Sequence, residues 1–249
     1  MTEFAYSLED KSTQRAHLGL VVLQSDESIE RDFRHMLPSE AVSLYVTRVA
    51  SDPEVSSENL AKMKNRIEAA AGLLPRPVTY HAIGYGCTSG TSVIGVDEVS
   101  RQLHAGCSAK AATQPVSALL AAAKALGVTR LAFLSPYVEE VSSHLRNVLA
   151  DNGLQSPVFG TFNEAREERV AWIDGPSILK AAKALAQQGG VDAIFMSCTN
   201  LRTLGVIEQI EAETDLPALS SNQVLCWHMM RLAGLDDRMN GFGRLFREA

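Results

Sequence analysis

Residues 81–92 read HAIGYGCTSGTS, a short apolar strand that enters a turn rich in glycine, serine and threonine and then the start of a helix. Shifting the chain by 111 residues places the Cys-Thr pair at 87–88 on the Cys-Thr pair at 198–199. The same shift places the apolar segment 20–23 on 131–134, and a polar turn and an amphipathic helix follow each segment. The sequence therefore predicts two similar halves, each with one cysteine turn.

Strands and helices alternate along the rest of the chain. Apolar runs of four to nine residues predict strands, and stripes at helical spacing predict helices. We expect strands at 18–23, 41–49, 81–86, 130–134, 193–196 and 218–219, and helices at 26–37, 59–74, 115–126, 138–149, 177–188 and 204–213. This alternation is typical of α/β proteins, in which helices cover parallel sheets. We predict two pseudo-symmetric, flavodoxin-like parallel-sheet halves with the active site between them, one formed by 1–115 and a C-terminal helix at about 222–249, the other by 116–221.

Composition excludes several classes of protein. A net charge of −6 and a pI near 5.6 argue against a nucleic-acid partner, since such proteins carry basic patches. The apolar runs are too short for a membrane span, and the N-terminus has no secretory pattern, so we expect a cytoplasmic protein. The histidines and four cysteines have no metal-ligand spacing. We expect neither a metal nor a cofactor, and free thiols.

The two cysteine turns are the candidate site. Ligands of parallel α/β sheets bind at the carboxyl ends of the strands, where both turns are expected to lie. A helix N-terminus favours a substrate carboxylate and lowers the pKa of a thiol. Neutral donors flank each thiol, namely Thr88 and Ser89 in the first turn, Thr199 and Asn200 in the second. We therefore expect Cys87 and Cys198 to be reactive.

Other patterns are weaker. Cys107 and Cys226 lack such surroundings and are expected to be packing residues. The glycines at 84, 86 and 90 miss the dinucleotide-binding spacing by one residue, and no lysine follows to complete a phosphate loop. We therefore expect no nucleotide site.

Two motifs resemble those of a known superfamily. Residues 86–92, GCTSGTS, and 197–202, SCTNLR, are similar to signatures of maleate isomerases and arylmalonate decarboxylases, which belong to the aspartate/glutamate racemase superfamily. The likeness spans almost the whole chain. Segments 23–27 (LQSDE), 134–139 (LSPYVE) and 219–224 (LSSNQV) look most like the ectoine-utilisation branch, whose members are described as racemase-like or maleate-isomerase-like.

The resemblance implies site residues and a reaction class. It implies that Cys87 and Cys198 are the catalytic thiols. Decarboxylase relatives keep only the second cysteine, so the presence of both favours isomerisation or racemisation. Tyr137 matches a substrate-contacting tyrosine, although it could equally pack at the entry to a helix, and Asn163 matches an active-site asparagine. Members of this fold commonly form homo-oligomers, so we expect a dimer or tetramer.

The segment after the first strand departs from the family pattern. Maleate isomerases carry there an asparagine that binds a substrate carboxylate, whereas this chain has Gln24-Ser25-Asp26-Glu27. We take Gln24 and Asp26 as candidate substrate-binding residues. Asp26 either caps the following helix or enters the pocket, where its charge would repel a second carboxylate and attract an amine. In the second case the substrate is an amino or amidino acid rather than a plain dicarboxylate.

Three functions remain open from the sequence. The leading hypothesis is a racemase or isomerase of a small carboxylate or amino acid, such as a derivative of ectoine or hydroxyectoine, with one thiol acting on each face of a stereocentre. The first alternative is cis-trans isomerisation of maleate through a cysteine adduct. The second is a non-catalytic protein that binds carboxylates in the same cleft.

Overall fold

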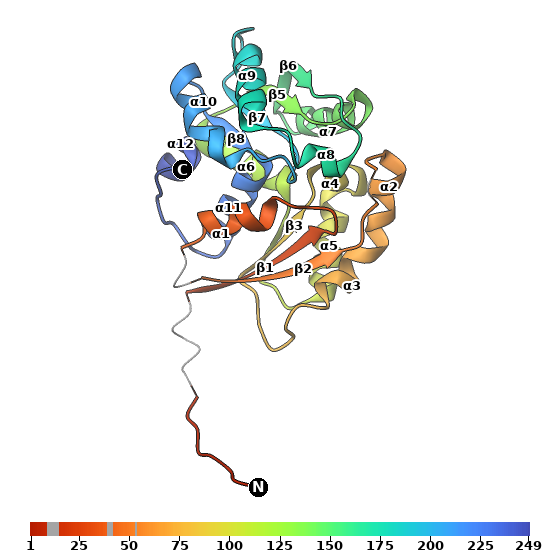
Figure 1. Ribbon diagram of the computed structural model, residues 1–249, viewed down its shortest axis with the longest axis vertical. Helices are drawn as coiled ribbons and strands as arrows, with labels where there is room; N and C mark the ends of the chain where they lie inside the picture. Colours follow the sequence, from red (N-terminus) through yellow and green to blue (C-terminus); the bar gives the residue numbers. More distant parts are fainter. Residues whose placement is uncertain (9–14, 39–41, 53) are drawn as a thin grey trace.

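Two four-stranded parallel sheets form the framework of the computed structural model, which describes residues 1–8, 15–38, 42–52 and 54–249 (Figure 1). The strand orders are β2-β1-β3-β4 and β6-β5-β7-β8, so the second sheet repeats the first with each strand number raised by four. The predicted fold class is confirmed. The strands are β1 Ala16–Leu23, β2 Val42–Val49, β3 Ala82–Gly86, β4 Ala112–Thr113, β5 Arg130–Ser135, β6 Gln155–Thr161, β7 Ala193–Met196 and β8 Ala218–Ser220.

Both faces of the central strands are buried. Alternate residues of a strand point to opposite faces, and in β1 Leu20 and Val22 belong to one apolar cluster while Val21 and Leu23 belong to another. The strand β5 divides between the same two clusters, with Phe133 in the first of them. Because each cluster contains residues of both sheets, the two halves share their cores.

Helices connect the strands and cover the sheets, as Figure 1 shows. No helix in the described ranges is long and apolar enough to cross a membrane. The helices are α1 Ile29–Met36, α2 Ser57–Lys62, α3 Ile67–Ala71, α4 Thr88–Ile94, α5 Val96–Gly106, α6 Pro115–Leu126, α7 Glu139–Asp151, α8 Glu167–Val170, α9 Gly175–Ala186, α10 Ile207–Thr214, α11 Ser221–Leu232 and α12 Gly243–Glu248, with 3-10 turns η2 Met63–Arg66 and η3 Leu204–Val206.

Helix α11 joins the two halves. It follows β8 of the second sheet, yet it packs against β3 of the first sheet and against α1 and α6. A glycine allows this close approach, because a Cβ atom on Gly84 would lie 2.5 Å from Sδ of Met229. The helix begins with a capping box in which the Ser220 and Gln223 side chains each bond the other residue's backbone N–H.

The structure differs from the predicted elements at a few places. The helix predicted at 59–74 is divided into α2, η2 and α3, although its apolar stripe still faces the core. The sequence analysis did not identify β4, α5 or β6. Strand β6 contains Pro157, which argues against a central strand but is tolerated at the sheet edge where β6 lies. Ala41, the first residue of the predicted second strand, lies outside the described residues.

Candidate active site

The two cysteine turns meet at one small cavity of about 10 Å³, which has room for about one water molecule. Cys87 follows β3 and precedes α4, while Cys198 follows β7, so equivalent positions of the two halves supply the thiols. Both side chains are at least 95% buried. The described lining residues include no lysine, arginine or histidine; they are Leu23, Asp26, Leu60, Cys87, Thr88, Ser89, Tyr137, Glu167, Cys198, Thr199 and Asn200.

The turn geometry positions the Cys87 sulfur. Cys87 is the N-cap of α4, and its Sγ accepts a hydrogen bond from the Gly90 N–H at 3.2 Å. A side chain at position 90 would be crowded, since its Cβ would lie 2.8 Å from that sulfur. Burial raises the pKa of Cys87 to about 12, and this outweighs the opposing hydrogen bond from Gly90. The sequence-based expectation of a lowered thiol pKa is therefore wrong. Desolvation raises the pKa of Cys87 more than the N-terminus of α4 lowers it.

Cys198 has a strained backbone and a different partner. Its φ of +88° lies in a region that residues other than glycine rarely adopt. Its Sγ accepts the Asn200 N–H at 3.3 Å and lies 2.8 Å from Oη of Tyr137. Burial raises the pKa of the Cys198 thiol well above its usual range, and the charge of Glu167 raises it further. The raised pKa favours the thiol form of this residue over the thiolate.

A chain of hydrogen bonds leads from Cys198 to a buried glutamate. Tyr137 Oη donates to Glu167 Oε1 at 2.6 Å, so the Cys198 thiol is left to donate to Tyr137. Asn200 Nδ2 donates to the other carboxylate oxygen, Glu167 Oε2, at 3.0 Å. Glu167 begins α8 and is only 4% exposed. Burial raises its pKa, while the hydrogen bonds from Tyr137 and Asn200 oppose the shift. This chain offers the thiol proton a route to a carboxylate.

Sequence reasoning missed Glu167. It lies in the polar segment 164–168, which contains three glutamates, and neither spacing nor composition distinguishes it from its neighbours. Only the burial of its side chain identifies it.

Asp26 fulfils both roles that the sequence left open. Its Oδ1 caps α1 by accepting the N–H groups of Ser28 and Ile29, each at 2.8 Å. The side chain also lines the cavity, where Oδ2 has no hydrogen-bond partner in the described part of the chain. Burial raises the pKa of Asp26, although these two backbone N–H groups and the nearby Thr199 hydroxyl lower it.

The remaining predicted residues divide into two groups. Thr88, Ser89 and Thr199 line the cavity, and the two threonine hydroxyls also link separate segments: Thr88 Oγ1 donates to Ser221 Oγ at 2.8 Å, and Thr199 Oγ1 donates to the Gly86 carbonyl at 3.2 Å. Gln24 and Asn163, in contrast, are exposed and do not line it. The geometry gives no support to substrate binding by these two residues, because their side chains lie at the surface.

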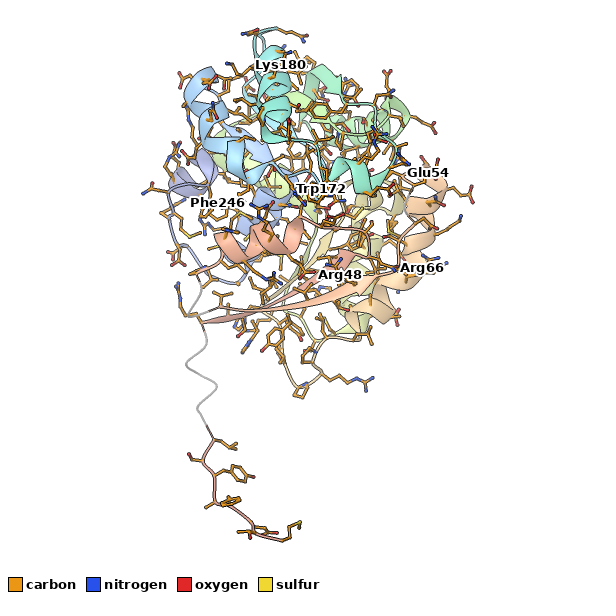
Figure 2. The ribbon with its side chains drawn as sticks, in the orientation of Figure 1. Arg48, Glu54, Arg66, Trp172, Lys180 and Phe246 are labelled. Atoms are coloured by element: carbon orange, nitrogen blue, oxygen red, sulfur yellow. The ribbon has the colours of Figure 1, made fainter. Side chains whose placement is uncertain are left out.

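Trp172 lies where the two halves meet (Figure 2). The Arg202 guanidinium stacks over the Trp172 ring at 4.2 Å and lies 3.7 Å from Glu27. Asn200 ties these segments together, since its Oδ1 accepts the Glu27 N–H at 2.8 Å and Ser28 Oγ donates to its carbonyl at 2.8 Å. Asn200 also lines the cavity, so these hydrogen bonds link the two halves beside it. No group of three or more histidine, cysteine or acidic residues in the described ranges could hold a metal ion.

The amino-acid sequence is similar to those of known proteins. The family model for arylmalonate decarboxylase matches residues 37–246. A maleate isomerase of Nocardia farcinica is 27% identical over 93% of this chain and 95% of that protein. An arylmalonate decarboxylase of Bordetella bronchiseptica is 30% identical over 53% of this chain and 56% of its own length.

Solved structures with a similar fold include two maleate isomerases. A cysteine-to-serine variant of the Nocardia farcinica maleate cis-trans isomerase, with a covalently bound succinylcysteine intermediate, superimposes with a TM-score of 0.85 at 25% identity and covers 94% of this chain and 99% of that chain. A maleate isomerase of Pseudomonas putida with maleate gives a TM-score of 0.84 at 20% identity, over 94% of this chain and 98% of that chain.

Proposed function

The chain belongs to the arylmalonate decarboxylase family, and on that premise we propose that it is a cofactor-independent isomerase of a small carboxylate that uses Cys87 and Cys198. The observation that carries this proposal is the presence of two buried thiols, one from each half, in a single cavity. Two thiols can add to a substrate and move a proton without any cofactor.

Cis-trans isomerisation through a covalent adduct is the reaction that the relatives support best. A similar structure contains a succinylcysteine, the adduct expected when a thiolate adds to maleate. In this chain Cys87 would first lose its thiol proton to water. Its thiolate would then attack one carbon of the double bond, and the Cys198 thiol would give its proton to the other carbon. Rotation about the new single bond, return of that proton to Cys198 and expulsion of Cys87 would yield the trans isomer.

The different partners of the two thiols support this division of roles. Cys198 contacts Tyr137, which donates to Glu167, so a proton can be held and returned along this chain. Among the described residues, no such chain leads from Cys87 to a carboxylate: the Gly90 N–H donates to its sulfur, and the Tyr85 hydroxyl also interacts with it and lowers its pKa. We therefore assign addition to Cys87 and proton transfer to Cys198.

The test uses a panel of small cis-unsaturated carboxylates headed by maleate. We expect formation of the trans isomer, detected by proton NMR, and an adduct on Cys87 in a trapped complex analysed by peptide mass spectrometry. A folded protein that gives neither product nor adduct with any member of the panel would contradict the proposal.

Racemisation is the second candidate, and Asp26 favours it. A buried carboxylate oxygen without a partner suits the ammonium group of an amino acid, such as one derived from ectoine or hydroxyectoine. The readout is incorporation of deuterium from solvent at the α-carbon of each enantiomer. Assembly into a homo-oligomer and a cytoplasmic location stay predictions of the sequence.

A further inference from the structure

Two carboxyl groups face the same cavity from different segments. Asp26 lies between β1 and α1, and Glu167 begins α8; each side chain is only 4% exposed. We call these two residues the acidic pair. Both line the same cavity, and the charge of Asp26 raises the pKa of Glu167.

One oxygen of the acidic pair is available to a ligand. The Glu167 oxygens accept hydrogen bonds from Tyr137 and Asn200, and Asp26 Oδ1 caps α1. Asp26 Oδ2 is buried and has no partner among the described residues. A buried carboxylate oxygen that lacks a donor is costly, so a donor on the substrate would offset this cost.

No protein cation in the described lining balances the acidic pair. Arg48 does not line the cavity; its guanidinium donates to the carbonyl groups of Leu23 and Asp26 and pairs with Glu30. Its charge lowers the pKa of Asp26, but burial has the larger, opposite effect. A dicarboxylate would therefore bring two negative charges to a cavity that already contains two carboxyl groups and two ionisable thiols.

We propose that the substrate is a small carboxylate that also carries a cationic nitrogen, an ammonium or amidinium group, whose N–H groups donate to Asp26 Oδ2. This inference rests on the proposed isomerase function and names the substrate class of the same site. Glu167 adds to the negative potential, and Ser89, which lines the same cavity, can donate its hydroxyl hydrogen to the substrate carboxylate.

A cationic substrate would also prepare the thiols. After burial, the negative charges of Glu167 and Asp26 contribute to the raised pKa of both Cys87 and Cys198. A cation beside the acidic pair offsets these charges and favours the thiolate. The reactive sulfur would then form only when a substrate of the correct charge is bound.

The test compares two saturated ligands by isothermal titration calorimetry on the full chain. Succinate carries two carboxylates, and 4-aminobutanoate carries one carboxylate and one ammonium group; neither has a double bond to isomerise. We expect the wild-type protein to bind 4-aminobutanoate at least tenfold more tightly than succinate. Asp26→Asn keeps an oxygen that can cap α1 but replaces Oδ2 by an N–H₂ donor, so it should remove or reverse that preference.

A matched control is Asp174→Asn. Asp174 caps α9 by accepting the Ser177 N–H at 2.8 Å and does not line the cavity, so this variant should keep the wild-type preference. Equal or tighter binding of succinate by the wild-type protein, failure of both ligands to bind, or an unchanged preference in Asp26→Asn would each overturn the inference. Because the readout is binding, the proposed isomerisation is judged separately by product and adduct.

Discussion

The phenolic oxygen of Tyr137 lies 2.8 Å from the sulfur of Cys198 and at the same time donates a hydrogen bond to Glu167 at 2.6 Å. The tyrosine thus connects a thiol of the second half to a carboxylate that the sequence did not reveal. If Cys198 moves a proton during isomerisation, this connection decides how readily the proton leaves and returns.

Removing the phenolic hydroxyl tests that connection. Tyr137→Phe keeps the ring but breaks both hydrogen bonds, and we expect kcat to fall about 100-fold, as is typical for the loss of an acid-base contribution. KM should change much less, because the ring still lines the cavity. Steady-state kinetics on the substrate found with the panel measures both constants. A change confined to KM would indicate that Tyr137 only contacts substrate.

The charge of Glu167 should set the pH range in which Cys198 remains a thiol. Ionised Glu167 raises the pKa of Cys198, so Glu167→Gln should lower that pKa and shift the alkaline limb of the kcat profile to lower pH. The ultraviolet absorbance of the thiolate, followed as the pH is raised, provides a second readout. An alkaline limb that stays in place or moves upward would show that Glu167 has no electrostatic influence on Cys198.

Asn200 should stabilise the closed arrangement of the two halves. Asn200→Ala removes the donor to Glu167 Oε2 and the acceptor of the Glu27 N–H, and it leaves a buried carboxylate less satisfied. We expect the free energy of unfolding to fall by about 2–3 kcal/mol, measured by urea denaturation. The control is Asn152→Ala, whose side chain makes one exposed hydrogen bond to Val148; its cost should stay within about 0.5 kcal/mol.

Asp32 should contribute more to stability at mildly acidic pH than at neutral pH. Burial raises the pKa of Asp32 to about 6, although Asn222 Nδ2 donates to it at 2.8 Å and opposes the shift. The folded state therefore binds more protons than the unfolded state between about pH 4 and 6, and stability is lost as the pH rises through this window. The loss for Asp32 alone is on the order of 3 kcal/mol.

Urea denaturation between pH 4 and 7.5 measures this effect. Asp32→Asn is neutral throughout, so its stability should fall less than that of the wild-type protein as the pH rises. Burial raises the pKa of Asp26 and Glu167 but lowers the pKa of His81 and His228, and these opposing contributions remain in both proteins, so the difference between the two profiles reports on Asp32. Identical slopes in the variant and the wild-type protein would contradict the assignment to Asp32.

The architecture and the central pair of the site could be predicted because they leave periodic signals. The 111-residue repeat aligns β1 with β5 and the Cys87 turn with the Cys198 turn, and both turns reach one cavity. Edge strand β6 gave no such signal, since Pro157 interrupts its pattern.

Other features depend on three-dimensional burial and could not be predicted. In the sequence, Glu167 cannot be distinguished from Glu168 beside it, which is exposed. Only in the folded chain is the Glu167 side chain, at the start of α8, seen to be buried. The same holds for the pKa of Cys87 and Cys198: the helix start was visible in the sequence, but the desolvation that outweighs it was not. Asp26 was predicted either to cap a helix or to face the pocket, and its two oxygens allow both.

The last prediction separates the roles of the two thiols. If Cys87 adds to the double bond and Cys198 supplies the proton, Cys198→Ser should still form the adduct on Cys87 but release little trans product, whereas Cys87→Ser should form no adduct. Intact-protein and peptide mass spectrometry detect the adduct, and proton NMR in deuterium oxide detects product and exchange. The control is Cys107→Ser, because Cys107 is a half-buried thiol outside the cavity; this variant should behave as wild type.

If the reaction is racemisation instead, neither Cys87→Ser nor Cys198→Ser should form an adduct. Each of these two variants should then lose deuterium exchange from one enantiomer while keeping some from the other, since each thiol would serve one face. An adduct on Cys198 in the Cys87→Ser variant contradicts the assignment, because the thiol bonded to Tyr137 would then be the one that adds to substrate.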